Sequence, residues 1–304
     1  MSLMSQNPLR SVVPSFCAAF GGRSRKRAER KASPATSPAD TVDAVSEPTL
    51  ETTLHDEHVE GRQYRVHASG TTDAGSATVL LVHGIGMTHA SLDPVQHALP
   101  AGVRCLNVDL AGFGSTEHPG DAVAIERYAA DLAEIMDRLD AWPIVAAGHS
   151  MGSQVVLELA RLRPEGVRTV VMVGPVVDDA RRTVPRQAAD LARDTFGEPL
   201  PVNTLVLRDY VRGGIRWYVA VLRQMMRYPT LERMRECTVP VVVVRGRHDP
   251  IARGDWCVRL VGAAPGAARL LTVEGDHHVV PRTSPGWLAA ELAALAGGSD
   301  VGGS

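Results

Sequence analysis

The sequence has little cysteine and no excess of either charge. Its four cysteines, Cys17, Cys105, Cys237 and Cys257, lie far apart and form no CxxC pair and no spacing typical of metal ligands. This pattern predicts reduced thiols in a cytoplasmic protein, with Cys105 buried in a strand. The formal net charge of −2 gives no electrostatic reason to expect a nucleic acid as partner.

The sequence also lacks long apolar runs and the common cofactor motifs. No run approaches the roughly 20 residues that span a bilayer, so we expect no membrane span. There is no Walker-type phosphate loop, and "AGFGST" at 111–116 lacks the third glycine of a dinucleotide loop. "HDEH" at 55–58 has no third ligand at metal spacing. We therefore expect neither a cofactor nor a metal ion.

Residues 1–47 differ in composition from the rest of the chain. They are rich in Ser, Pro, Ala and Arg, and the stretch 23–31 holds six basic residues against one acid. The apolar run at 11–20 is short, and its positive charge lies on the wrong side for a secretory signal. We expect a disordered basic tail over 1–47; the alternative is a basic arm for an anionic surface or a targeting segment.

From about residue 50, strand-like apolar runs alternate with helical patterns. Two short strands meeting at Gly61 suggest a hairpin at a sheet edge. Apolar runs typical of buried parallel strands follow at 77–84, 103–110, 143–148, 167–177, 239–246 and 268–275. Helices are expected over 125–139 and 151–163. This alternation predicts an α/β protein with a mainly parallel central sheet, flanked by helices.

The stretch 178–236 breaks this alternation, because it contains no strand-like run. Residues 213–229 are apolar nearly all round, with a narrow stripe of Arg216, Ala220, Arg223 and Arg227 toward water, as in a helix covered on two sides. We expect 178–236 to be a helical lid, inserted into a core of 48–177 and 237–304. The alternative is that these helices merely flank the sheet.

The motif G-x-S-x-G at 148–152 lies where a strand is expected to stop and a helix to start. A turn that sharp leaves no room for side chains beside the serine, so small residues are needed at Gly148 and Gly152. The backbone of Ser150 is expected to be strained, with the hydroxyl held out of the sheet's carboxyl edge. A serine that only caps a helix would not need both glycines.

A nucleophilic serine needs a base to take its proton and an acid to orient that base. Asp249 follows one predicted strand, and the pair His277 and His278 follows the next. The run "LLVHGIG" ends a strand and leaves the backbone N–H of Ile85 to point into the same crevice. Together with the N–H of Met151, it is expected to form an oxyanion hole.

These motifs and their order resemble the α/β-hydrolase family. The order Ser150, Asp249, His278 matches the family's nucleophile, acid and histidine, and "VHGIG", "DLAGFGST" and "RGRHDPIARGDW" resemble its oxyanion, D-x-x-G-x-G-x-S and acid segments. The resemblance implies that His278 is the base, since the family's histidine commonly precedes a proline by seven residues, as His278 precedes Pro285. His277 remains the alternative.

The acid also has an alternative, because Asp178 or Asp179 follows the preceding strand, where some relatives keep theirs. Dehalogenase and epoxide-hydrolase activities are disfavoured, because those relatives carry aspartate at the position of Ser150.

The resemblance implies a serine hydrolase that cleaves a carboxylic ester or thioester of a small to medium, mostly apolar substrate through an acyl-enzyme. Candidates to line the pocket under the lid are Tyr210, Trp217, Tyr218, Met225 and Met226. Alternatives with the same triad are a C–C bond hydrolase, a lactonase or a perhydrolase. A slow-turnover ligand receptor and a structural protein that interacts through its basic tail are rivals from other classes.

Overall fold

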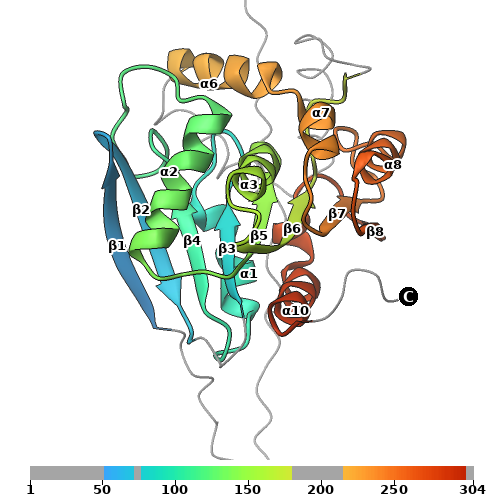
Figure 1. The fold of residues 1–304 in the computed structure, drawn as a ribbon, viewed down its shortest axis with the longest axis horizontal. Helices are drawn as coiled ribbons and strands as arrows, with labels where there is room; N and C mark the ends of the chain where they lie inside the picture. Colours follow the sequence, from blue (N-terminus) through green and yellow to red (C-terminus); the bar gives the residue numbers. More distant parts are fainter. Residues whose placement is uncertain (1–50, 72–76, 180–214, 299–304) are drawn as a thin grey trace, which may run out of the picture. The chain divides into compact units, whose positions relative to one another are not determined.

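The computed structural model describes residues 51–71, 77–179 and 215–298, which belong to a compact unit from Pro48 to Ser304. The tail predicted over 1–47 lies outside the described residues. An eight-stranded sheet in the order β1-β2-β4-β3-β5-β6-β7-β8 forms the centre (Figure 1). Its strands are β1 Thr52–Val59, β2 Arg62–Ser69, β3 Thr78–Val82, β4 Cys105–Asp109, β5 Ile144–His149, β6 Val167–Val173, β7 Val241–Gly246 and β8 Ala268–Val273.

The strands from β4 to β8 in the sheet order are parallel, and β2 is the one described strand that runs in the opposite direction. β1 and β2 form an antiparallel hairpin whose turn holds Glu60 at φ 45° and Gly61 at φ 78°. β2 also pairs antiparallel with β4, and the five neighbouring pairs from β4 to β8 are parallel. The predicted α/β class with a mainly parallel sheet is confirmed.

Helices cover both faces of the sheet. On one face, α2 (Ile125–Arg138), α3 (Met151–Leu162) and α8 (Gly254–Ala263) bury apolar side chains in the larger core cluster. On the other, α1 (Asp93–Ala98) and α10 (Pro285–Ala296) pack on the smaller cluster. Two short elements, η1 (His89–Ser91) and α9 (Val280–Thr283), complete this side. Inner strands are buried on both faces, which explains their continuous apolar runs.

One strand ends earlier than its apolar run suggests. The run 167–177 predicts a strand throughout, whereas β6 ends at Val173. Gly174 has φ 59° and Val177 has φ 64°, and neither angle is compatible with an extended strand. The chain therefore turns at the carboxyl edge of the sheet, where the site residues gather.

Between β6 and β7 the structure describes two helices, α6 (Ile215–Arg227) and α7 (Thr230–Arg235), and α6 lies across one end of the sheet (Figure 1). Arg216, Arg223 and Arg227 on α6 are exposed, as the sequence predicts. Residues 180–214 lie outside the described part, so the lid over 178–236 stays a prediction. None of the described helices combines the length and apolar character needed to cross a membrane.

Candidate active site

Ser150 occupies a strained turn between β5 and α3. Its backbone has φ 54° and ψ −116°, a combination that is unfavourable for a residue with a Cβ atom. Ser150 precedes the first residue of α3, yet its side chain makes no capping hydrogen bond to this helix, which the structure describes in full. The turn therefore has the geometry expected of a nucleophile elbow rather than of an ordinary serine cap.

The two glycines of the motif lie in backbone-to-backbone contact. A Cβ atom added to Gly148 would lie 2.1 Å from the carbonyl oxygen of Gly152. One added to Gly152 would lie 2.2 Å from the carbonyl oxygen of Val82, in β3. Both distances are far below van der Waals contact, so the turn requires glycine at these two positions for steric reasons.

Asp249 and His278 form a buried pair from the loops after β7 and β8. Nδ1 of His278 donates a hydrogen bond to Oδ2 of Asp249 at 2.8 Å. Oδ1 of the same carboxylate accepts the backbone N–H groups of Ile251 and Ala252, each at 2.8 Å. Burial acts to raise the pKa of Asp249, but His278 and the two amides outweigh it, and the pKa lies below its usual value. The carboxylate is thus ionised and fixed in orientation.

The alternative acid and base have other partners. Asp178 and Asp179 both form ion pairs with Arg259 of α8. The ring of His277 lies 5.7 Å from the ring of His248, centroid to centroid. The geometry therefore favours Asp249 and His278 over these alternatives, and the assignment of their catalytic roles stays a prediction.

The imidazole of His278 lies at the same sheet edge as the turn at Ser150. A Cβ atom on Gly174 would lie 2.9 Å from Cε1 of His278, so the ring packs directly on this glycine. The preceding residue, Val173, accepts the backbone N–H of Ser150 at 2.9 Å. His149 donates from Nε2 to the backbone oxygen of His278 at 3.1 Å. The end of β6 and the side chain of His149 thus connect the turn at Ser150 with the loop that carries His278.

The loop after β3 lies against the serine. A Cβ atom on Gly84 would lie 3.1 Å from Cβ of Ser150. His83 holds this loop, because its Nδ1 donates to the carbonyl of Gly84 at 2.8 Å and its Nε2 accepts the N–H of Leu110 at 3.1 Å. In the described part of the chain, the backbone N–H groups of Ile85 and Met151 make no hydrogen bond to a backbone carbonyl. Their role as oxyanion donors stays a prediction.

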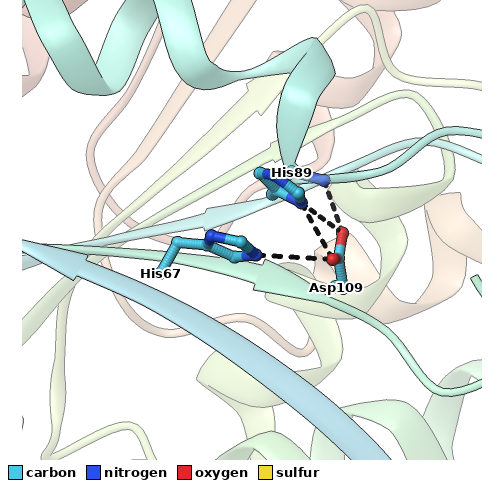
Figure 2. A group of neighbouring side chains, drawn as sticks. All are labelled: His67, His89 and Asp109. Carbon is cyan, nitrogen blue, oxygen red and sulfur yellow. Dashed lines mark hydrogen bonds and ion pairs between the residues drawn. The ribbon is translucent and has the colours of Figure 1, made fainter. Parts of the chain in front are cut away.

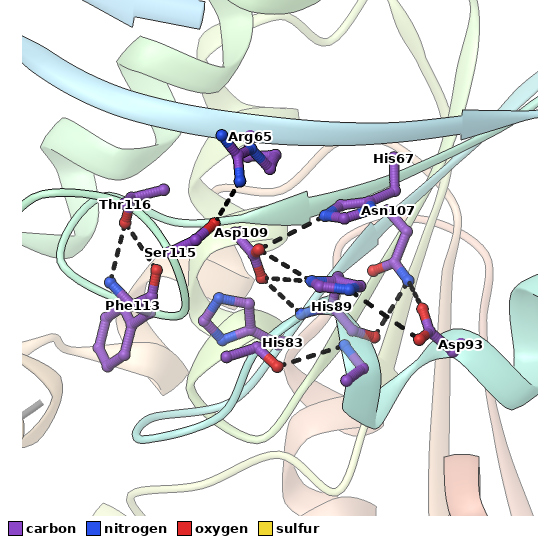
Figure 3. A network of polar contacts seen from close by, with 12 residues as sticks. Arg65, His67, His83, His89, Asp93, Asn107, Asp109, Phe113, Ser115 and Thr116 are labelled. Carbon is purple, nitrogen blue, oxygen red and sulfur yellow. Dashed lines mark hydrogen bonds and ion pairs between the residues drawn. The ribbon is translucent and has the colours of Figure 1, made fainter. Parts of the chain in front are cut away.

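The loop after β4 is cross-linked by its own side chains (Figure 3). The hydroxyl of Thr116 accepts the N–H of Phe113 at 3.1 Å and contacts the carbonyl of Leu110 at 2.9 Å. Arg65 of β2 donates to the hydroxyl of Ser115 at 2.7 Å. The ring of Phe113 lies 5.3 Å from that of His83, so this loop and the loop after β3 form one packed unit.

Two of the predicted pocket residues on α6 meet these loops. Trp217 is 9% exposed and packs on Gly112 and, at 6.3 Å between ring centroids, on Phe113. Tyr218 packs on Gly86, in the loop after β3. His118, which the sequence did not single out, lies 4.9 Å from Trp217. No sequence pattern pointed to this histidine, because it lies in an irregular loop.

Three further pocket candidates are Met225, Met226 and Tyr210. Met225 and Met226 are buried, and the backbone oxygen of Met225 accepts a hydrogen bond from Gln154 of α3 at 3.2 Å. Both methionines belong to the larger core cluster, as Trp217 does, and their pocket roles stay predictions. Tyr210 lies outside the described residues.

Comparison with known proteins agrees with this architecture. Residues 77–212 match the family described as the alpha/beta hydrolase fold. The structure of a thermophilic esterase from Thermogutta terrifontis superimposes with a TM-score of 0.66 at 18% identity, over 82% of this chain and 99% of that one. This chain has the fold of the α/β-hydrolase family. The resemblance predicted from the motifs is confirmed.

Proteins similar in sequence to this chain include named enzymes. A 2-hydroxy-6-oxononadienedioate/2-hydroxy-6-oxononatrienedioate hydrolase of Cupriavidus pinatubonensis is 26% identical over 239 residues, 67% of this chain and 81% of that protein. Lipase LipV of Mycobacterium tuberculosis is 30% identical over 112 residues, 37% of this chain, and the match spans 42% of that lipase. These matches support a hydrolase in general terms.

Proposed function

We propose that this protein is a serine hydrolase that cleaves a carboxylic ester or thioester through an acyl-enzyme. The observation that carries the proposal is the hydrogen bond of 2.8 Å between His278 and Asp249, at the sheet edge where Ser150 occupies a turn with φ 54°. A strained serine, a histidine and a buried carboxylate are the groups that acyl transfer by a serine nucleophile requires. The fold and the named relatives support the same class.

In this mechanism Oγ of Ser150 attacks the acyl carbon, and Nε2 of His278 takes the hydroxyl proton. Asp249 keeps Nδ1 of the imidazole protonated and stabilises the imidazolium that forms. His278 then gives the proton to the leaving alcohol or thiol. Water adds to the acyl-enzyme by the same route in reverse, which releases the acid and the free serine.

The negative oxygen of the tetrahedral intermediate would be bound by the backbone N–H groups of Ile85 and Met151. Met151 is the first residue of α3, so the positive end of this helix faces the same oxygen. Each such donor typically contributes about 3–4 kcal/mol to the transition state. The hydrogen bonds of His83 would hold the loop that carries Ile85 in place.

The acyl chain would lie between the loops after β3 and β4 and the inner side of α6. Trp217 and Tyr218 project from α6 onto these loops, and the three arginines of the helix lie on its exposed side. This arrangement supports the lid proposal and a mostly apolar acyl group.

A second candidate is hydrolysis of a carbon–carbon bond beside a ketone. It is favoured by the 26% identical relative, whose name gives 2-hydroxy-6-oxononadienedioate and 2-hydroxy-6-oxononatrienedioate as its substrates. Loss of dienolate absorbance from a 2-hydroxy-6-oxo-dienoate would support this candidate, and release of p-nitrophenol from p-nitrophenyl esters of graded length would support the esterase.

A fluorophosphonate probe tests the proposed nucleophile directly. The wild type is expected to be labelled covalently and the Ser150→Ala variant unlabelled. Ser115→Ala, which removes an exposed hydroxyl in the loop after β4, serves as the matched control and is expected to label like the wild type. A folded wild type that remains unlabelled would contradict the proposal and favour a ligand-binding role.

A further inference from the structure

Three side chains of the types that bind metal ions, two histidines and an aspartate, lie together near the start of η1 (Figure 2). His67 comes from β2, His89 from η1 and Asp109 from the end of β4. Their ligand atoms all lie within 4.8 Å of one another. None of the three belongs to the candidate active site.

The carboxylate of Asp109 is held so that one oxygen faces both imidazoles. Oδ1 accepts the backbone N–H of His89 at 2.7 Å. Oδ2 lies 2.8 Å from Nδ1 of His89 and 3.5 Å from Nε2 of His67. The two rings are stacked, with centroids 3.5 Å apart and planes at 19°. One nitrogen from each ring and Oδ2 of Asp109 thus lie close together.

The charge of this site is incompletely balanced. Asp109 is fully buried, and within the described residues its ion-pair partners are only the two histidines, which are neutral unless protonated. Nε2 of His67 is itself buried and, among the described residues, makes no hydrogen bond. A buried anion facing such a nitrogen is suited to a cation.

A further carboxylate lies behind His89. Oδ2 of Asp93 is 4.0 Å from Nε2 of this histidine, and Oδ1 of Asp93 accepts a hydrogen bond from Asn107 at 3.2 Å (Figure 3). Histidines that bind metals through one nitrogen commonly present the other nitrogen to a carboxylate. Asp93 is placed for that positioning role.

We propose that Nε2 of His67, Nδ1 of His89 and Oδ2 of Asp109 bind a divalent transition metal ion such as zinc, with solvent in the remaining position. Two imidazoles and one carboxylate are ligands that zinc and its neighbours accept. In a tetrahedral zinc site, ligand atoms lie about 3.3 Å apart, so the 2.8 Å contact of His89 opens by about half an ångström. As the ion binds, the proton leaves Nδ1 of His89 and the neutral ring carries its N–H on Nε2, the nitrogen that faces Asp93.

The ion would join β2, β4 and η1, the segment that follows the proposed oxyanion loop. His89 lies only a few residues after Ile85 in the sequence. Bound metal is therefore expected to stabilise this part of the fold against unfolding. The proposal does not depend on the proposed hydrolase activity.

Titration of the metal-free full chain with Co²⁺ tests the site. The wild type is expected to bind one ion per chain with visible ligand-field bands, to lose them on adding Zn²⁺, and to melt at a higher temperature with Zn²⁺. Loss of a residue that only supports a ligand typically lowers metal affinity about 10–100-fold. His67→Gln and His89→Gln, which remove ligands, are expected to lower the affinity for Co²⁺ by more than this. Asp93→Asn is expected to lower it by about tenfold. His97→Gln, an exposed histidine on α1, should bind like the wild type.

Two results would overturn the proposal. One is a wild type that shows no ligand-field bands at stoichiometric Co²⁺. The other is binding of equal strength in the wild type and in the two ligand variants, which would place the ion elsewhere. Circular dichroism of the metal-free variants checks that they fold. If neither folds, the proposal is tested on the wild type, which should bind one ion per chain and melt at a higher temperature with Zn²⁺.

Discussion

Nε2 of His149 lies 3.1 Å from the backbone oxygen of His278, and the imidazole of His149 is almost completely buried. Burial first, and the neighbouring His278 second, lower the pKa of His149 from 6.5 to about 3. The folded protein therefore keeps this ring neutral in mildly acidic solution, whereas the unfolded chain protonates it.

This difference predicts acid sensitivity caused by His149. The folded-state pKa is depressed, so the stabilisation is fully present above about pH 6.5 and is lost as the pH falls toward 3. The free energy of unfolding should decrease by up to about 1.4 kcal/mol per pH unit in this window from this residue alone. Urea unfolding between pH 7 and 4 measures it. His149→Gln, which keeps an N–H donor, should give a shallower pH dependence, and an unchanged slope would contradict the assignment.

Replacing Asp249 by Asn is expected to abolish most of the activity without unfolding the protein. The amide can donate to Nδ1 of His278 and so favours the wrong tautomer, which in a comparable triad lowers kcat by about 10⁴. Asp178→Asn, which alters a carboxylate paired with Arg259, should change kcat/KM only a few-fold. Ester hydrolysis by the two purified variants compares the alternative acids, and the opposite ranking would move the acid to Asp178.

Gly152→Ala is expected to destabilise the turn at Ser150. The new Cβ atom would lie 2.2 Å from the carbonyl oxygen of Val82, and overpacking of this kind costs about 1–3 kcal/mol. Gly262→Ala in α8 meets no atom within 4 Å and should stabilise the helix by about 0.5–1 kcal/mol. Thermal unfolding measures both. A Gly152→Ala variant that melts at the same temperature as the wild type would show that the backbone can shift to relieve the contact with Val82.

Trp217→Leu is expected to change the chain-length preference of the enzyme more than its activity on the shortest ester. The indole packs on Gly112 and Phe113, so a smaller side chain widens the space over the loop after β4. The ratio of kcat/KM for long and short p-nitrophenyl esters should shift by about tenfold. Arg223→Ala, on the exposed side of the same helix, should leave this ratio unchanged. A constant ratio in both variants would contradict the lid proposal.

Much of the fold could be predicted because buried parallel strands have a simple signature. The run 77–84 is apolar without interruption because β3 is covered on both faces, and α2 shows its buried side in every third or fourth residue. The short α1 was not predicted, since six residues are too few to establish a helical period. The pairing of Asp249 with His278 depended on strand order, which the family resemblance supplied.

The cluster of His67, His89 and Asp109 could not be predicted in the same way. Its members come from β2, η1 and β4, and they become neighbours because β2 pairs antiparallel with β4. The spacing of these residues in the sequence does not predict that β2 and β4 pair. The histidines of "HDEH", which are neighbours in the sequence, lie on the edge strand β1.

The two sides of the proposed pocket are built from different kinds of contact. The turn at Ser150 depends on main-chain atoms that almost touch, at Gly148, Gly152 and Val82, whereas α6 reaches the neighbouring loops through the rings of Trp217 and Tyr218. Evolution can therefore exchange the residues of α6 and so diversify which molecules are accepted, while the nucleophile's geometry is inherited unaltered. New specificities in descendants of this protein should accordingly be found as changes on α6, with both glycines retained.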